Sequence, residues 1–218
     1  KVVEKMVQEA ISFSGVQNIL DINQNEELFS DKMKAQLEKI DLPITKFNTL
    51  KKLINKSISE YRKINKVKAI EFYEKLKRIV DEYNNRDNKL NANTVITDFV
   101  NNLSDSLLKV HEDLKKDRNS FKKMGISFEE KAFFDILIKV RDTHNFEYNE
   151  EKCLNLAKKI KLLVDDKSQF ADWSSRDDIK NLLSMDLTVL LHNNGYPPEW
   201  DEEVFTKVLE QAENMKKN

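Results

Sequence analysis

Residues 45–83, TKFNTLKKLINKSISEYRKINKVKAIEFYEKLKRIVDEY, decide the fold class, because this long segment has no Gly or Pro and its apolar residues recur at helical spacing. At about 100° per residue, two runs share one side of a helix: Phe47, Leu50, Ile54, Ile58 and Tyr61, then Ala69, Phe72, Leu76, Val80 and Tyr83. The second run resumes the phase of the first. The segment therefore predicts long amphipathic helix and an all-α protein.

Three apolar residues in the middle of this segment, Ile64, Val67 and Ile70, lie away from that side and pass around the opposite face. One interpretation is a break near Asn65. The other is an unbroken helix whose middle is covered on two faces, by its own domain and by a partner. Under the second interpretation, Ile64, Val67 and Ile70 form part of a partner interface.

The rest of the chain favours the same fold class, since its 218 residues include only three Gly and three Pro. We expect an irregular bundle of seven or eight helices, two of them long. Further helices are predicted by apolar spacing and by cap residues over 1–13, 30–40 (N-cap Ser30), 94–123, 127–140, 149–164, 179–190 and 201–215. Ser127 to Glu130 and Ser175 to Asp178 both have capping-box spacing. In the helix after Ser175 the apolar positions are Ile179, Leu182, Leu183, Leu187 and Leu190.

The opening residues Lys1 to Lys5 lie inside an amphipathic pattern and lack an initiator Met, so we expect the chain to be a piece of a longer protein. We predict that residues 1–29 are a helix and connector from an upstream domain. Residues 30–218 would then form a separate helical domain.

Charge is balanced overall but not locally. Lys and Arg number 37 against 38 Asp and Glu, which argues against a strong field for nucleic acid. Between Lys46 and Arg78, however, eleven basic residues face only three acidic ones. Lys52, Lys56 and Lys63, with Lys66 close by, form a basic stripe. This stripe is either a solvated helix face or a contact with nucleic-acid phosphates or with an acidic partner surface.

Signals for catalysis, cofactors or metals are absent from the sequence. The three Gly are isolated, so there is no phosphate-binding loop, and His111, His144 and His192 are scattered without ligand spacing. A single cysteine, Cys153, excludes an internal disulfide and suits a reducing cytoplasm. No stretch approaches the roughly 20 apolar residues that a membrane span needs.

Two tryptophans, Trp173 and Trp200, each precede a predicted helix and lie near Arg176 and Tyr196. Aromatic residues and arginine are enriched at interface hot spots. Packing in the core or at a helix start is the alternative interpretation. These four residues complete the candidate partner interface.

Several phrases together resemble the C-terminal helical region of the restriction (motor) subunit of type I restriction–modification enzymes. They are Glu9-Ala10 with Gly15-Val16, Tyr83-Asn84-Asn85-Arg86, Gly125-Ile126-Ser127-Phe128-Glu129-Glu130 running into Ala132-Phe133-Phe134-Asp135, Asp172-Trp173 with Arg176, Gly195-Tyr196-Pro197-Pro198, and Val208-Leu209-Glu210-Gln211-Ala212-Glu213. Their order and spacing, over nearly the whole chain, carry the resemblance.

The resemblance implies a cytoplasmic parent with a nuclease domain and ATP-dependent translocase lobes upstream, acting against foreign DNA with ATP and Mg²⁺. No catalytic, cofactor-binding or metal-binding position transfers to this chain. It implies that residues 1–29 lead in from the translocase domain and that residues 30–218 are a non-catalytic assembly domain. This domain would dock the motor onto the methyltransferase and specificity subunits and meet DNA within the full complex. We expect the fragment itself to be monomeric. A DNA-backbone contact through the basic stripe, and a regulatory pocket for a small anion or nucleotide, are the alternatives.

Overall fold

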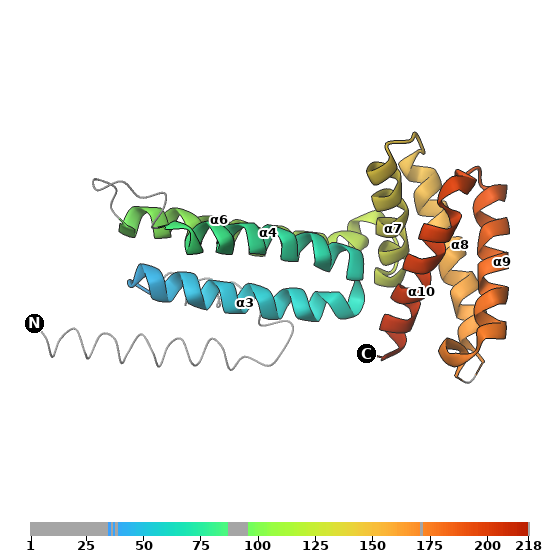
Figure 1. Ribbon diagram of the computed structural model, residues 1–218, viewed down its shortest axis with the longest axis horizontal. Helices are drawn as coiled ribbons and strands as arrows, with labels where there is room; N and C mark the ends of the chain where they lie inside the picture. Colours follow the sequence, from blue (N-terminus) through green and yellow to red (C-terminus); the bar gives the residue numbers. More distant parts are fainter. Residues whose placement is uncertain (1–34, 36, 38, 87–95, 171, 218) are drawn as a thin grey trace, which may run out of the picture. The chain divides into compact units, whose positions relative to one another are not determined.

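The computed structural model describes residues 35, 37, 39–86, 96–170 and 172–217 of the chain (Figure 1). Within them the secondary structure is helical throughout: seven α-helices, two short 3-10 helices and no strand. The predicted all-α class is therefore confirmed. The predicted helix over 1–13, the cap at Ser30 and the domain boundary after residue 29 lie outside the described residues.

The chain divides into two compact units, and each unit contains two separate segments of the sequence. The described residues of unit 1 are those up to 60 together with 69–86 and 96–118, whereas unit 2 comprises 61–68 and the described residues from 119 on. The single helical domain predicted for 30–218 thus contains two packed bodies. The short segment 61–68 belongs to unit 2 although its neighbours on both sides belong to unit 1.

Unit 1 is built from α3 (Pro43–Ile64), α4 (Lys66–Asn84) and most of α6 (Ile96–Met124), which lie side by side (Figure 1). Phe47 near the start of α3 stacks on Tyr83 near the end of α4, with ring centroids 4.1 Å apart, so α3 and α4 run antiparallel. The two predicted apolar runs are buried along this hairpin, apart from the half-buried Val80. From α6 the buried apolar residues are Val100, Leu103, Leu107, Val110 and Leu114.

The segment quoted first is broken at Asn65, where α3 ends and α4 begins one residue later. The break is therefore confirmed and the unbroken helix is wrong. The physical reason is that the two apolar runs bury each other, which requires the chain to turn back on itself. Ile64 and Val67 are half-buried, and Val67 packs against the core of unit 2, whereas Ile70 is 44% exposed.

Side chains of α10 (Asp201–Lys217) and α7 (Phe128–His144) form hydrogen bonds with the residues around this break. Gln211 accepts a hydrogen bond from the backbone N–H of Lys66 and donates one to the carbonyl of Ile64, both at 2.8 Å. Asn214 donates to the carbonyls of Arg62 and Lys63. We call Asn65, Asp135, Gln211 and Asn214 the junction clasp.

Asn65 is itself 1% exposed and joins the clasp through both atoms of its amide. Its Nδ2 donates to Asp135 at 2.6 Å, and its Oδ1 accepts from the backbone N–H of Lys68 at 3.1 Å, which caps the first turn of α4. Asp135 is also paired with the buried Lys131. The clasp thus combines one buried side-chain pair, Asn65 with Asp135, with two side chains of α10 that bond to the backbone on either side of the break.

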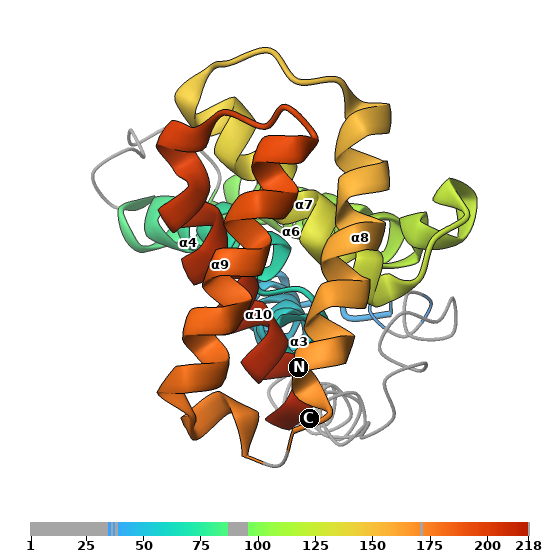
Figure 2. The same ribbon diagram turned by 90° about the vertical axis from the view of Figure 1, so that its right-hand side faces the viewer.

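Unit 2 is a four-helix bundle of α7 (Phe128–His144), α8 (Glu150–Ser168), α9 (Asp177–Asn193) and α10 (Asp201–Lys217). Each helix contacts the next along the chain, and α10 closes the ring by packing on α7 (Figure 2). The core includes Phe133, Leu137, Leu156, Ile160, Leu183, Leu187, Val204 and Val208.

Helix ends in unit 2 match one sequence prediction and contradict another. At Ser127 both hydrogen bonds of a capping box are present, with Glu130 as the partner. At Ser175 the box does not form, because Ser175 belongs to the 3-10 helix η2 (Trp173–Ser175) and Arg176 takes the N-cap position without a side-chain bond. Gly195, at φ 71°, adopts the left-handed backbone expected after α9. The bundle then continues through η3 (Pro198–Trp200) into α10.

Candidate functional site

Helix α9 has apolar residues on both of its faces. Ile179, Leu183, Leu187 and Leu191 are buried in the bundle. On the far side Leu182, Met185 and Val189 are 48%, 66% and 58% exposed. Their spacing places them on one line along the helix, and we call them the α9 stripe.

Leu182 is one of the apolar positions that the sequence indicated for this helix, but its side chain lies outside the core. Leu182 and Leu183 are adjacent and about 100° apart around the axis, so only one of them can face the centre of the core. Leu183 takes that place at 0% exposure. Met185 and Val189 were not identified from sequence, although their spacing from Leu182 is a signal that was available.

Charged pairs lie beside the α9 stripe. Asp186 accepts from Lys167 at 2.8 Å, and Asp178 pairs with Arg176 through two hydrogen bonds. The hydrogen bond from Arg176 lowers the pKa of the Asp178 carboxyl. An apolar centre with a polar rim is the usual anatomy of a protein–protein contact.

Two of the four predicted aromatic and arginine contacts are core residues. Trp173 and Tyr196 are each 1% exposed, and the Tyr196 hydroxyl donates to the backbone carbonyl of Leu137. Burial raises the pKa of Tyr196. For these two residues the structure agrees with the alternative interpretation, packing in the core. Arg176 is exposed near the start of α9.

Trp200 is half-buried at the surface and stacks on His144, with ring centroids 3.5 Å apart. The His144 Nε2 lies 2.6 Å from a carboxylate oxygen of Glu203. A hollow of about 470 Å³ beside Trp200 is lined mainly by acidic residues, namely Glu199, Glu202, Glu203 and Glu210. Such a wall repels phosphate, so it does not support the predicted anion pocket.

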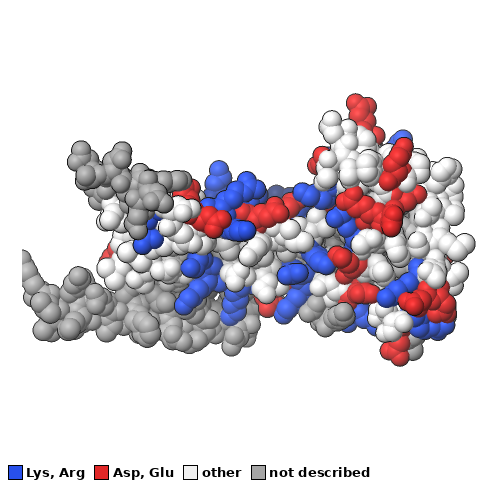
Figure 3. All heavy atoms as spheres, viewed as in Figure 1, with Lys and Arg blue, Asp and Glu red and all other residues white. Residues whose placement is uncertain are grey.

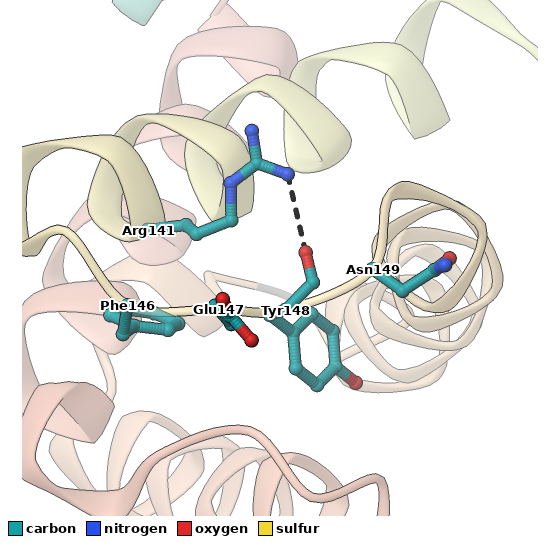
Figure 4. Close-up of a pocket in the computed structure, with 5 residues that line it drawn as sticks. All are labelled: Arg141, Phe146, Glu147, Tyr148 and Asn149. Atoms are coloured by element: carbon teal, nitrogen blue, oxygen red, sulfur yellow. Dashed lines mark hydrogen bonds between the residues drawn. The ribbon is translucent and has the colours of Figure 1, made fainter.

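A second hollow, shown in Figure 4, has an arginine in its wall together with Phe146, Glu147, Tyr148 and Asn149. Arg141 donates to the backbone carbonyl of Tyr148 at 3.2 Å and is paired with Asp142. The guanidinium therefore ties the loop between α7 and α8 to the end of α7. The small anion or nucleotide site stays a prediction without a supporting observation.

The predicted basic stripe is only partly assembled. Lys52 and Lys63 are exposed on α3 and Lys56 is half-buried beside them. Lys66 lies beyond the break, on α4, and its ammonium is 2.6 Å from Glu210 of α10. Figure 3 shows Lys and Arg side chains along the edges of unit 1 with Asp and Glu side chains between them.

Reactive groups are scarce among the described residues. Cys153 is fully buried in unit 2, and this burial raises the pKa of its thiol to about 11. No group of three or more His, Cys, Asp or Glu residues in the described ranges could hold a metal ion. None of the described helices is long and apolar enough to cross a membrane.

The described residues thus define a class: an all-α module with an exposed apolar stripe on one helix. The family model described as "Type I restriction enzyme HindI endonuclease subunit-like, C-terminal" matches residues 1–218. The chain belongs to this family, which confirms the resemblance found in the sequence.

Two curated relatives are named as endonuclease subunits of type I restriction enzymes. The chain is 22% identical over 217 residues to the type I restriction enzyme HindI endonuclease subunit of Haemophilus influenzae, covering 98% of this chain and 19% of that protein. It is 20% identical over 198 residues to the putative type I restriction enzyme MjaIXP endonuclease subunit of Methanocaldococcus jannaschii, covering 88% of this chain and 18% of that protein. The chain thus spans less than a fifth of either relative. No solved structure matches it.

Proposed function

We propose that this chain is the non-catalytic docking domain of a type I restriction endonuclease subunit. It would hold the ATP-dependent translocase and nuclease, which need Mg²⁺, on the methyltransferase and specificity subunits. The setting would be cytoplasmic defence against foreign DNA. The family supports a subunit that assembles with others. The docking role itself rests on the surface of unit 2.

The α9 stripe is the observation that carries the proposal. Met185 and Val189 expose more than half of their surface, on a helix that the bundle holds from its other side. Burying a large apolar side chain is worth about 1.5–3 kcal/mol, so a partner would gain substantially by covering them. A rigid helix face also costs little entropy on binding.

A retention assay tests this role. Tagged chain should retain the methyltransferase–specificity complex, and the double variant Met185→Asp/Val189→Asp should weaken retention at least ~10-fold, because each aspartate would be desolvated in the contact. Leu162→Asp is the matched control, since Leu162 is 69% exposed on α8 outside the stripe. Unchanged circular dichroism and melting temperature would show that the variants remain folded.

Two results would reject the docking role. One is equal retention by the double variant and the parent chain. The other is full assembly of the enzyme from an endonuclease subunit that lacks these 218 residues.

A contact with the DNA backbone is the second candidate, and the composition of α3 favours it. The helix carries six Lys or Arg residues and one Glu, and Lys52 and Lys63 are exposed. Replacing Lys52, Lys56 and Lys63 by Glu should weaken duplex DNA binding and reduce its salt dependence, because fewer counterions would be released. Fluorescence anisotropy over a salt series measures both effects. Binding unchanged at every salt concentration would reject the contact.

A further inference from the structure

The junction between α3 and α4 lacks the residues that normally interrupt a helix. Between Ile58 and Ala69 the chain has no Gly and no Pro. The apolar runs on either side are in phase, and a continuous helix would place Asn65 in the middle of their shared face. Asn65 is thus a single polar residue where an unbroken stripe would carry an apolar one.

The clasp replaces the hydrogen bonds that an unbroken helix would make at this place. A continuous helix would pair the N–H groups of residues 66, 67 and 68 with the carbonyls of residues 62, 63 and 64. In the structure Gln211 and Asn214 bind all three of these carbonyls. Gln211 and Asn65 bind the N–H groups of Lys66 and Lys68. Side chains therefore bind five of the six backbone groups that would pair with one another if the helix straightened.

Straightening within one chain would expose the apolar sides of α3 and α4, which are now buried. A second copy of the chain removes this cost, because it offers the same α4 and α6 surfaces to the released α3. We propose that Asn65 is the hinge of a helix exchange in which α3 of each copy packs in unit 1 of the other. In that dimer residues 43–84 form one continuous helix.

The clasp restrains this exchange in the native chain. Opening the hinge would part Asn65 from Asp135 and leave an amide on the apolar face of the continuous helix, which is unfavourable without partners. It would also release both hydrogen bonds of Gln211. Exchange through short hinges is a recognised route to dimers, and the native sequence disfavours it with buried polar contacts.

The first test changes only the hinge residue of the 218-residue chain. Asn65→Leu completes the apolar stripe and removes the cap of α4, so light scattering should show a dimer where the parent chain is a monomer. The control is Asn65→Leu/Lys66→Pro: proline fits the first turn of α4 but cannot lie inside a continuous helix, so this variant should stay monomeric.

A disulfide distinguishes exchange from any other association. Phe47 and Tyr83 stack across the hairpin, so cysteines at these two positions should link within one chain in the parent background. In the Asn65→Leu background the same pair should link two chains, which non-reducing electrophoresis resolves. The native Cys153 is fully buried and should not interfere.

A monomeric Asn65→Leu variant, or a dimer whose disulfide stays within one chain, would overturn the proposal. If Asn65→Leu does not fold, Gln211→Ala decides instead. It removes two of the clasp hydrogen bonds from each hinge and should tighten dimerisation ~10-fold or more, with the same disulfide between chains. A folded Gln211→Ala chain whose dimerisation constant equals that of the parent chain would overturn the proposal equally.

Discussion

At the scale of single residues, the Cys153 thiol is a reactive group that the fold buries completely. It lies in the core beside α7, and desolvation by burial raises the pKa of its thiol to about 11, from an ordinary value of 9.0. Only the thiolate is a nucleophile, so raising the pKa removes reactivity as well as access.

We predict that Cys153 reacts slowly with a thiol reagent at pH 8. A pKa higher by two units lowers the thiolate fraction about 100-fold, before steric protection is added. The time course of Ellman's reagent in buffer, compared with that in concentrated urea, measures the difference. Similar rates in the two solutions would mean that the thiol is exposed. The raised pKa also means that the folded chain loses stability above pH 9, where the unfolded thiol ionises first.

At the scale of elements, the two similar sequence signals at Ser127 and Ser175 end differently: α7 has a side-chain cap at its start and α9 has none. Ser127 Oγ accepts the N–H of Glu130 at 3.1 Å, and the Glu130 carboxylate accepts the N–H of Ser127 at 2.8 Å. Ser175 is drawn into a 3-10 turn, where its N–H donates to the carbonyl of Asp172. Three-residue spacing alone cannot tell these outcomes apart.

We predict that Ser127→Ala costs about 1 kcal/mol in the free energy of unfolding, because it removes the hydroxyl that accepts the backbone N–H of Glu130 in the first turn of α7. Ser175→Ala should cost only a few tenths. Urea unfolding followed by circular dichroism compares the pair directly. Equal losses for the two serines would show that the capping box contributes nothing beyond helix propensity.

At the scale of the whole molecule, the sequence predicts the class and the buried faces well, because helical spacing follows directly from local geometry. Phe47, Leu50 and Ile54 were assigned to the inner face of α3 from spacing alone and are fully buried. The break at Asn65 was one of two alternatives, because nothing local distinguishes it from continuous helix. Its contacts come from Gln211, 145 residues away from Lys66 in sequence.

The exposed faces of the candidate contact surface also depend on contacts between residues that are distant in sequence. A helix that is apolar on two sides does not reveal which side the bundle will take, so the sequence named Leu182 beside Leu183 without separating their faces, and Met185 and Val189 were missed. Trp173 and Tyr196 attract attention as aromatic residues near an arginine, yet the surrounding helices bury both. Exposure depends on how α8, α9 and α10 pack, which the sequence pattern leaves open.

The side chains that cap the α3–α4 junction belong to α10, which is synthesised much later than the junction itself. A ribosome releases residues 43–84 long before it releases α10, and until then the carbonyls of Arg62, Lys63 and Ile64 have no Gln211 or Asn214 to bind them. The nascent segment, which contains no helix-breaking residue, can meanwhile extend as a single rod. Among the described helices, α10 is thus synthesised last, and it supplies the caps of the α3–α4 fold-back.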